Sequence, residues 1–330
     1  MIKKRIAVGL DVGGTTLKCG LIEESGKLLL LRKRKTDIHK GRETILTDIE
    51  ELIRSVLTEK RLTEKEVAGI GLGTPGYVVN GVIHGSPNMP GWHGTPIVKI
   101  MKSAFKTPFF ASNDVTLAAL AEYVVGQKRK VSNMIFYAIG TGIGGGLIID
   151  GQVYEGSFGM AGELGHVIVE PGGRLCGCGI QGCVEAYSST VGMVGIAKEL
   201  LTGSKGKNSR IYRAVKGDLS KVTPKIIYDM AKEGDKVGLQ INETVCRYLS
   251  MAMGGMINII NPDLVVLGGG VMQAGDIIMK KIKHYLPRYT LPDLLSHCRL
   301  DYAKLGEHAG VIGCGALVFQ KLGANIRSKA

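Results

Sequence analysis

The sequence has few aromatic residues, few prolines and no long apolar run. Aromatic residues make up 5% of the chain and Trp92 is the single tryptophan, which argues against a surface built for stacking nucleic-acid bases. Only 10 prolines accompany 48 glycines, so the glycines do not form a low-complexity linker and must serve backbone geometry. The most apolar stretch, residues 251–272, is broken by asparagine, proline, aspartate and glycine, so we expect no membrane association.

The composition is that of a globular protein. The 330 residues suffice for about two domains, and 45% of them are hydrophobic. The formal charge is +13, from 42 Lys and Arg against 29 Asp and Glu, but the basic residues form short scattered runs without a nucleic-acid-binding motif. We therefore expect dispersed surface charge and no nucleic-acid partner. The charged start of the chain leads directly into a strand and does not resemble a signal peptide, which predicts a cytoplasmic protein.

The order of the predicted elements repeats along the chain. Three antiparallel strands open it, helices and strands then alternate, and the pattern restarts near residue 131. The later predicted elements are a strand at residues 264–267 and helices near residues 184–200, 236–260, 276–286 and 308–322. The lysine-rich residues 202–223 have few apolar anchors and are predicted to be an exposed excursion. This order predicts an α/β fold with two copies of one architecture.

Two glycine-rich turns are the first candidate binding feature. Asp11-Val-Gly-Gly-Thr-Thr and Gly140-Thr-Gly-Ile-Gly-Gly-Gly each join two predicted strands. Glycine lets backbone N–H groups approach an anion and threonine hydroxyls add donors, so two such turns facing each other would grip a polyphosphate. The alternative is that the glycines only form tight turns. We predict that the nucleotide is bound here by Asp11, Gly13, Gly14, Thr15, Thr16, Lys18, Gly140, Thr141 and Gly142.

Asp11 favours the phosphate interpretation. A carboxylate beside a phosphate is unfavourable unless a divalent cation lies between them, so we assign Asp11 to Mg²⁺, directly or through water. Gly140, Gly142 and Gly145 also match the dinucleotide pattern GxGxxG, which would indicate a dehydrogenase. That pattern requires a helix directly after the turn, whereas the residues after Gly146 predict a strand.

Asp114 is the candidate general base. It follows Asn113 between a predicted strand and a predicted helix, a place where either residue is a common helix N-cap. We expect Asn113 to cap the helix, while Asp114 accepts a hydroxyl proton as the nucleophile attacks phosphorus. Asn88 lies in a proline-punctuated loop that either presents its amide to a ligand or is an ordinary turn.

A polyhydroxyl ligand is suggested by Glu163, His166 and Glu185. Carboxylates and imidazole make hydrogen bonds in fixed directions, although the glutamates would also be ordinary at a surface. His166 also belongs to a second group of residues. Three of the seven cysteines lie within eight residues, and together with His166 they form the ligand set of a closed tetrahedral zinc site. The predicted metal ligands are His166, Cys176, Cys178 and Cys183.

The zinc is predicted to be structural, because a closed site has no open position for water. With one nitrogen on zinc, His166 would keep the other for a substrate hydroxyl. The alternative is a redox-labile cysteine group.

A set of short motifs occurs in one order along nearly the whole chain. These are Asp11-x-Gly-Gly-Thr, Gly73-Thr-Pro-Gly76, Asn113-Asp114, Gly140-Thr-Gly-x-Gly-Gly, Ala161-Gly-Glu-x-Gly-His166, Cys176-x-Cys-Gly-x-x-Gly-Cys-x-Glu185 and Leu267-Gly-Gly-Gly270. In this combination the chain resembles the ROK family of sugar kinases and sugar-responsive repressors. The resemblance implies an α/β fold of two RNase-H-like, actin- and hexokinase-like domains with a cleft between them. It places the first domain at residues 1–114, completed by the C-terminal helix 308–330, and the second at 115–307 with a zinc-binding insert at 166–185.

The resemblance also implies residue roles. Asp114 would be the general base, and the sugar would be held by Gly76, Asn88, Asn113, Asp114, Glu163, His166 and Glu185. Gly268, Gly269 and Gly270 would lie near the adenosine. The implied function is that of an ATP-dependent hexose kinase with Mg²⁺ and structural Zn²⁺, most similar to a glucokinase, and the family habit predicts a homodimer or homotetramer.

Two alternatives to a glucokinase are kept. N-acetylmannosamine or another hexose could replace glucose, since these sugars differ at only one or two ring positions. A repressor is disfavoured, because only residues 1–4 precede the first predicted strand and leave no room for a helix-turn-helix.

Overall fold

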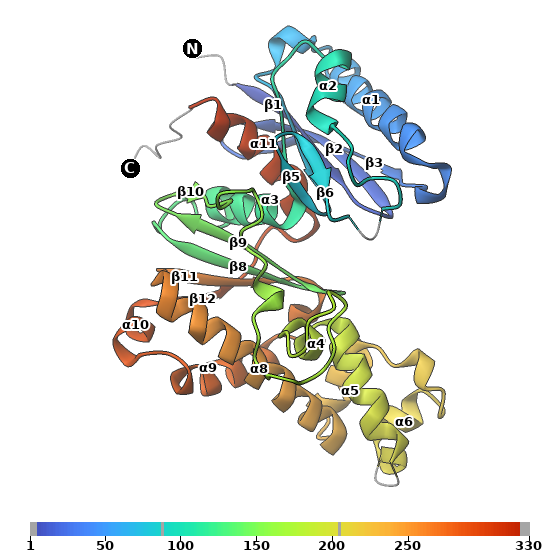
Figure 1. Ribbon diagram of the computed structural model, residues 1–330, viewed down its shortest axis with the longest axis vertical. Coiled ribbons are helices and arrows are strands. Elements are labelled where there is room, and N and C mark those ends of the chain that lie inside the picture. The colour runs from blue at the N-terminus through green and yellow to red at the C-terminus, as the bar shows by residue number, and fades with distance from the viewer. Residues whose placement is uncertain (1–4, 87–88, 204–205, 324–330) are drawn as a thin grey trace. The chain divides into compact units, whose positions relative to one another are not determined.

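The computed structural model describes residues 5–86, 89–203 and 206–323. The chain divides into two compact units (Figure 1). The first unit comprises Met1–Ser132, Gly146–Gly162 and Lys304–Ala330, and the second comprises Asn133–Gly145 and Glu163–Ala303. Within the described part of the chain, no helix is both long and apolar enough to cross a membrane.

The first unit contains a five-stranded sheet in the order β3-β2-β1-β4-β7. Its strands are β1 (Ile6–Val12), β2 (Thr16–Glu23), β3 (Leu28–Lys35), β4 (Ile70–Thr74) and β7 (Phe109–Asn113). The first three strands pair antiparallel, which confirms the predicted opening meander, and β1, β4 and β7 pair in parallel. A short hairpin of β5 (Tyr77–Val79) and β6 (Val82–His84) was not predicted, because three residues are too few to show an alternating pattern.

Alternation along β1 determines what each of its side chains meets. Val8, Leu10 and Val12 are buried in a core that includes the apolar face of α1 (Arg42–Glu59). Asp11 has the opposite orientation, toward α11 (Ala309–Lys321), and these two helices cover opposite faces of the sheet (Figure 1). The acidic residue of the first glycine turn is therefore placed against the last helix of the chain.

Glycines let α11 lie directly on this sheet. A Cβ atom at Gly71 would lie 1.9 Å from the carbonyl oxygen of Cys314, and one at Gly313 would lie 1.8 Å from that of Leu117. Leu117 belongs to α3 (Asp114–Ala121), so α3 and α11 pack backbone to backbone. This packing places residues 115–132 in the first unit, whereas the sequence-based boundary began the second domain at residue 115. The first unit also contains the helix α2 (Ile97–Ala104).

A second five-stranded sheet has the order β10-β9-β8-β11-β12. Its strands are β8 (Met134–Ile139), β9 (Ile143–Ile149), β10 (Gln152–Val153), β11 (Leu264–Gly268) and β12 (Arg299–Tyr302). The order is again third, second, first, fourth and fifth in the sequence, and β8, β11 and β12 again pair in parallel. The predicted duplication of one architecture is thereby confirmed. β9 begins in the second unit and continues into the first.

Helices make up most of the rest of the second unit. They are α4 (Glu185–Ser188), α5 (Thr190–Thr202), α6 (Arg210–Ala214), α7 (Pro224–Lys232), α8 (Lys236–Ile260), α9 (Asp276–Tyr285) and α10 (Pro292–His297). α8 matches its predicted range. The predicted helix at 184–200 is interrupted at Ser189, whose hydroxyl accepts a hydrogen bond from the N–H of Gly192 and caps α5.

The prediction that residues 202–223 form an exposed excursion is correct only in part, since many described residues of the segment are exposed but three apolar ones anchor it. Ile211 and Val215 are buried one helical turn apart, and Val222 is buried beyond them. The helix α6 and two short 3-10 turns form in this segment. A few apolar residues at helical spacing are enough to anchor this segment to the core. Their spacing is hard to recognise in the sequence because many lysines surround them.

Candidate functional site

The first glycine turn joins β1 to β2 and is held by Thr36. The N–H of Gly13 donates to the carbonyl of Thr16 at 3.1 Å and closes the turn. Thr36 then binds both sides of the turn, since its N–H donates to the carbonyl of Thr15 at 2.9 Å and its hydroxyl to that of Gly13 at 2.7 Å. Engaging these carbonyl oxygens removes groups that would repel an anion. The sequence carried no signal for Thr36, because it follows β3, well beyond the motif.

Asp11 faces Lys18 across the β1–β2 ladder. The two residues are register partners, and Lys18 Nζ lies 3.7 Å from Asp11 Oδ2. Lys18 Nζ also donates to the carbonyl of Glu307 at 3.0 Å. Burial raises the pKa of Asp11 above its usual value, and Lys18 opposes this rise. A positive charge beside Asp11 therefore stabilises its ionised carboxylate, which is consistent with the prediction that Asp11 binds Mg²⁺.

Asn113 and Asp114 stand at the start of α3. The side-chain oxygen of Asn113 accepts from the N–H groups of Val115 at 2.9 Å and Thr116 at 3.0 Å, which confirms it as the N-cap. Its amide nitrogen donates to the carbonyl of Gly76 at 2.9 Å. Asp114 is therefore not needed as the cap, and its carboxylate lies where the helix N-terminus favours negative charge.

Asp11, Gly76 and Asp114 lie at one edge of the first sheet. Asp11 is paired with Gly73 of β4, and Gly73 with Ser112 of β7. Asp11, Gly76 and Asp114 thus occur at or just beyond the carboxyl ends of the three parallel strands. Ligand sites in open α/β sheets form at that edge.

Trp92 anchors the segment that follows Asn88 in the sequence. Its side chain is fully buried, and its indole N–H donates to the hydroxyl of Thr74 at 2.7 Å. Ser86, before Asn88 in the sequence, donates its hydroxyl to the carbonyl of Pro75. Asn88 itself lies outside the described residues, so its predicted contact with the sugar stays a prediction.

The second glycine turn joins β8 to β9. The N–H of Gly140 donates to the carbonyl of Gly142 at 2.9 Å, and the N–H of Thr190 donates to the carbonyl of Gly140 at 2.8 Å. The N–H of Ile143 donates to Glu185 Oε2 at 2.7 Å. Thr141, between the two glycines, is exposed. Because β9 begins at Ile143, the turn leads into a strand, and the helix that a dinucleotide fingerprint requires is not formed.

The four predicted zinc ligands converge. One ligand atom from each of His166, Cys176, Cys178 and Cys183 lies within 4.8 Å of all the others. His166 Nδ1 is 3.7 Å from Cys176 Sγ, and the sulfurs of Cys178 and Cys183 are 3.7 Å apart. Tetrahedral zinc with ordinary bond lengths separates such ligands by about 3.6 to 3.8 Å. The donor set and these two distances are therefore compatible with Zn²⁺.

The other nitrogen of His166 faces Glu163. Nε2 lies 3.6 Å from Glu163 Oε2, so the ring presents one nitrogen to the cluster and one to a carboxylate. Burial raises the pKa of Glu163, which His166 partly offsets. Gly165, between them, lies against β9, where an added Cβ would be 2.2 Å from the carbonyl oxygen of Ile143.

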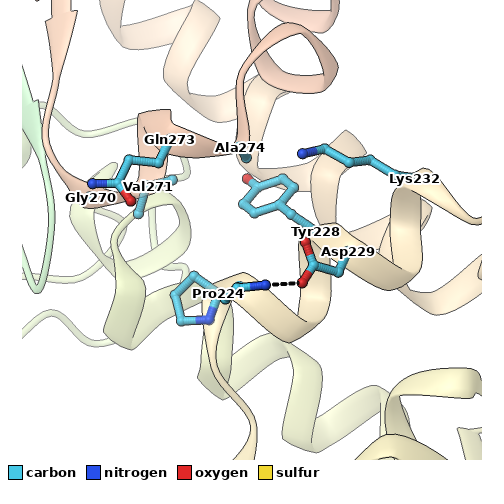
Figure 2. Close-up of a pocket in the computed structure, with 9 residues that line it drawn as sticks. Pro224, Tyr228, Asp229, Lys232, Gly270, Val271, Gln273 and Ala274 are labelled. Atoms are coloured by element: carbon cyan, nitrogen blue, oxygen red, sulfur yellow. Dashed lines mark hydrogen bonds and ion pairs between the residues drawn. The ribbon is translucent and has the colours of Figure 1, made fainter.

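A pocket of about 320 Å³ lies beside the third glycine run, Gly268–Gly270 (Figure 2). It is lined by Pro224, Lys225, Tyr228, Asp229, Lys232, Gly270, Val271, Gln273 and Ala274. Gly269 has φ +91°, and an added Cβ would lie 2.3 Å from the carbonyl oxygen of Ile139, the residue before the second turn. The pocket is therefore adjacent to that turn, and its size is typical of small-molecule sites.

Tyr228 gives this pocket a polar group. Its hydroxyl is buried without a hydrogen-bond partner among the described residues, and it points toward Ala274 (Figure 2). Lys225 and Asp229 form an ion pair in the same lining, drawn as a dashed line in Figure 2.

Comparison with known proteins identifies the family. The model of the ROK family matches residues 7–321. A glucokinase from Thermotoga maritima is 33% identical over 96% of this chain and 98% of its own length, and one from Halalkalibacterium halodurans is 35% identical over 95% of each chain. A xylose repressor from Caldicellulosiruptor bescii is 27% identical over 96% of this chain and 78% of the repressor.

Solved structures agree with the sequence comparison. The crystal structure of a ROK family glucokinase from Streptomyces griseus in complex with glucose and AMPPNP is 28% identical to this chain. It matches with a TM-score of 0.78 over 96% of this chain and 99% of that one. The duplicated five-stranded sheets and the family model lead to the same result: this chain belongs to the ROK family and has its two-domain fold, of the actin and hexokinase type.

Proposed function

We propose that this chain is an ATP-dependent hexose kinase that converts glucose to glucose 6-phosphate. The observation that carries the proposal is the placement of Asp11 and Asp114 at one edge of the first sheet, with Asn113 already serving as the cap of α3. The full-length similarity to proteins named glucokinase, and to one solved with glucose and AMPPNP, supports the activity and the choice of sugar.

Asp114 is proposed as the general base. Its carboxylate accepts the proton of the attacking sugar hydroxyl, which raises the nucleophilicity of that oxygen as it approaches the γ-phosphorus. Phosphoryl transfer requires little covalent chemistry from the protein, so most of the catalytic effect comes from positioning and charge. We propose that Gly76, Asn88, Asn113, Glu163, His166 and Glu185 bind the sugar hydroxyls.

The nucleotide is proposed to bind along the glycine runs. Backbone N–H groups of the two turns hold its phosphates, together with Thr15, Thr16 and Thr141. The pocket beside Gly270 takes the adenosine, since it adjoins the second turn through Gly269 and Ile139. Lys18 is turned toward Asp11 and Glu307, so we propose that it acts mainly by balancing the charge of Asp11.

The two metals have separate roles in this proposal. Asp11 offers a hard oxygen ligand of the kind that Mg²⁺ prefers. When bound, Mg²⁺ neutralises charge on the phosphate oxygens. Zn²⁺ would be held by the Cys3His cluster and would fix the aim of His166 toward the sugar.

The setting of the protein is also proposed. None of the seven cysteines, all of them among the described residues, forms a disulfide, which supports a reducing compartment such as the cytoplasm. A homodimer or homotetramer, and the absence of a nucleic-acid partner, remain predictions of the sequence.

A coupled assay of ADP release tests the activity. Purified protein with Mg·ATP is given glucose, N-acetylmannosamine, fructose or allose, and the phosphorylated position of the product is determined by NMR. We expect the highest kcat/KM with glucose, phosphorylated at position 6. A higher kcat/KM with another sugar would replace glucose in the proposal. ADP release that no sugar stimulates would overturn the kinase assignment in favour of a sugar-responsive regulator.

A further inference from the structure

The carboxylate of Glu185 contacts both the second glycine turn and the metal cluster. Oε2 accepts the N–H of Ile143 at 2.7 Å, and Oε1 lies 3.6 Å from Cys176 Sγ. A Cβ atom at Gly142 would lie 2.5 Å from Oε2, so any larger residue at this position would displace the carboxylate. One side chain therefore touches the end of the turn and the group that is proposed to organise the sugar site.

The chain that follows Glu185 holds the other end of the same turn. Glu185 is the first residue of α4, and α5 begins at Thr190, whose N–H donates to the carbonyl of Gly140 at 2.8 Å. The side chain of Ser188 donates to the carbonyl of Val245 at 2.9 Å and ties this segment to α8. Residues 185–190 thus form hydrogen bonds with Gly140 and with Ile143 at the two ends of the turn, and Ser188 attaches the same segment to α8.

Glu163, the neighbouring candidate sugar ligand, has a different set of partners. Its described ion-pair partner is His166, at 3.6 Å, and no described hydrogen bond joins its side chain to the turn. Both glutamates are therefore proposed to bind the sugar, but only Glu185 has a described hydrogen bond to the end of the turn. This difference makes Glu163 a matched control for Glu185.

We propose that Glu185 is a positioning residue for the turn at Gly140–Gly142, and that through it sugar binding and nucleotide binding favour each other. The inference rests on the proposed function, which assigns the sugar to Glu185 and the phosphates to the turn. A sugar hydroxyl bound to Glu185 restrains its carboxylate, which restrains the N–H of Ile143 and with it the turn. The nucleotide then binds a turn that is already ordered, and by linkage it strengthens sugar binding by the same factor.

The first test measures nucleotide affinity without sugar. Titration calorimetry with Mg·AMPPNP compares the zinc-loaded wild type with Glu185→Ala, Glu163→Ala and Glu185→Gln. We expect Glu185→Ala to weaken nucleotide binding about fivefold or more, and Glu163→Ala to leave it unchanged. Glu185→Gln should restore it, because an amide oxygen also accepts the N–H of Ile143. Wild-type affinity in Glu185→Ala, or no recovery in Glu185→Gln, would overturn the proposal.

A second measurement needs no variant and remains valid if Glu185→Ala fails to fold or to bind zinc. Amide hydrogen exchange of Ile143 is followed by NMR in the wild type with and without glucose, in the absence of nucleotide. We expect glucose to slow this exchange about fivefold or more relative to the amide of Ala303, which donates to the carbonyl of Leu267 in the sheet. If glucose changes the exchange rates of the two amides equally, the proposed coupling between the sugar and the turn is contradicted. A wild type that binds no nucleotide would instead contradict the proposed function itself.

Discussion

Asn113 and Asp114 are neighbours with side chains of almost the same shape. Both accept the N–H of Val115, and Asn113 also binds Thr116 and Gly76. Asn113 caps α3 with its oxygen and binds Gly76 with its nitrogen, so an amide is required there. Asp114 can only accept hydrogen bonds when ionised, as a general base must. One substituent therefore distinguishes the capping residue Asn113 from Asp114, the proposed general base.

Replacing Asp114 by Asn should separate binding from catalysis. We expect Asp114→Asn to lower kcat by about 10²-fold or more, because the base is lost, while sugar affinity is retained. Steady-state kinetics and calorimetric titration of glucose measure the two effects. Asp293→Asn is the control, since Asp293 is an exposed residue in the first turn of α10 and should leave kcat unchanged. Turnover near that of the wild type would exclude Asp114 as the base.

The buried position of Asp11 predicts a pH dependence of stability. Burial raises the pKa of Asp11 above the usual 3.8. At pH values between 3.8 and the raised pKa, the folded state therefore holds a proton that the unfolded state has lost. The contribution of Asp11 to the free energy of unfolding therefore falls as pH rises from 3.8 through the raised pKa, and is constant above it. Urea unfolding of the wild type and Asp11→Asn between about pH 4 and 7 should show the difference decreasing in that direction. An increase with pH would show that Lys18 outweighs burial.

The candidate site could be predicted from sequence where its chemistry is local. The Cys3His cluster, the cap at Asn113 and the two turns are recognisable because the residue types and their spacing carry the chemistry. Thr36 and the bond from Ile143 to Glu185 could not be found in this way. In each case a backbone group is one partner, and only the fold brings the two together.

At the scale of elements, glycines mark where two segments meet without a side chain between them. The short 3-10 helix Leu164–His166 lies against the start of β9, with Gly165 at the contact. This contact carries His166 and Glu163 on one side and the end of the second turn on the other. The position of His166, the proposed metal ligand, therefore depends on a close approach of two backbones.

The substitution Gly165→Ala should disturb that approach. Its Cβ would lie 2.2 Å from the carbonyl oxygen of Ile143, and we expect a loss of about 1 to 3 kcal/mol in unfolding free energy together with weaker zinc binding. Thermal unfolding and bound zinc measure both effects. Gly177→Ala is the matched control, because Gly177 lies in the same metal loop with nothing within 4 Å of an added Cβ. If the two variants behave alike, the contact with β9 has no special importance.

Elements with a long periodic pattern were predictable, and so was the short buried strand at residues 264–267, but several other short elements were not. The α8 helix and the opening meander follow directly from apolar spacing. The strands β5, β6 and β12 have only three or four residues, and they form because neighbouring elements complete their hydrogen bonds. α6 was missed because Ile211 and Val215 are set among lysines and arginines.

At the scale of the whole molecule, we expect zinc at the proposed Cys3His site to stabilise the second unit. Zinc binding at such sites is worth about 10 to 16 kcal/mol, as much as the whole stability of a typical domain. The segment that carries the ligands is joined to α8, because Tyr248 donates its hydroxyl to Glu170 at 2.7 Å. Loss of metal should therefore affect more than the loop itself.

Removal of the metal should lower both stability and sugar affinity. We expect a chelator to lower the Tm of the wild type and to weaken glucose binding, and Cys178→Ser to have a low Tm that the chelator no longer changes. Metal analysis, thermal unfolding and glucose titration provide the readout. Cys298→Ser, outside the cluster, should respond to the chelator as the wild type does. Metal-free protein with intact glucose affinity would contradict the link between the cluster and the sugar.

The single indole of this chain has a practical consequence. Trp92 is fully buried, bound to Thr74 at the end of β4, and a few residues from Asn88. Its emission therefore reports on one loop of the first unit without any label or background from a second fluorophore of its kind. A spectral change on adding glucose alone would give a direct optical signal for occupancy, available for every variant named above.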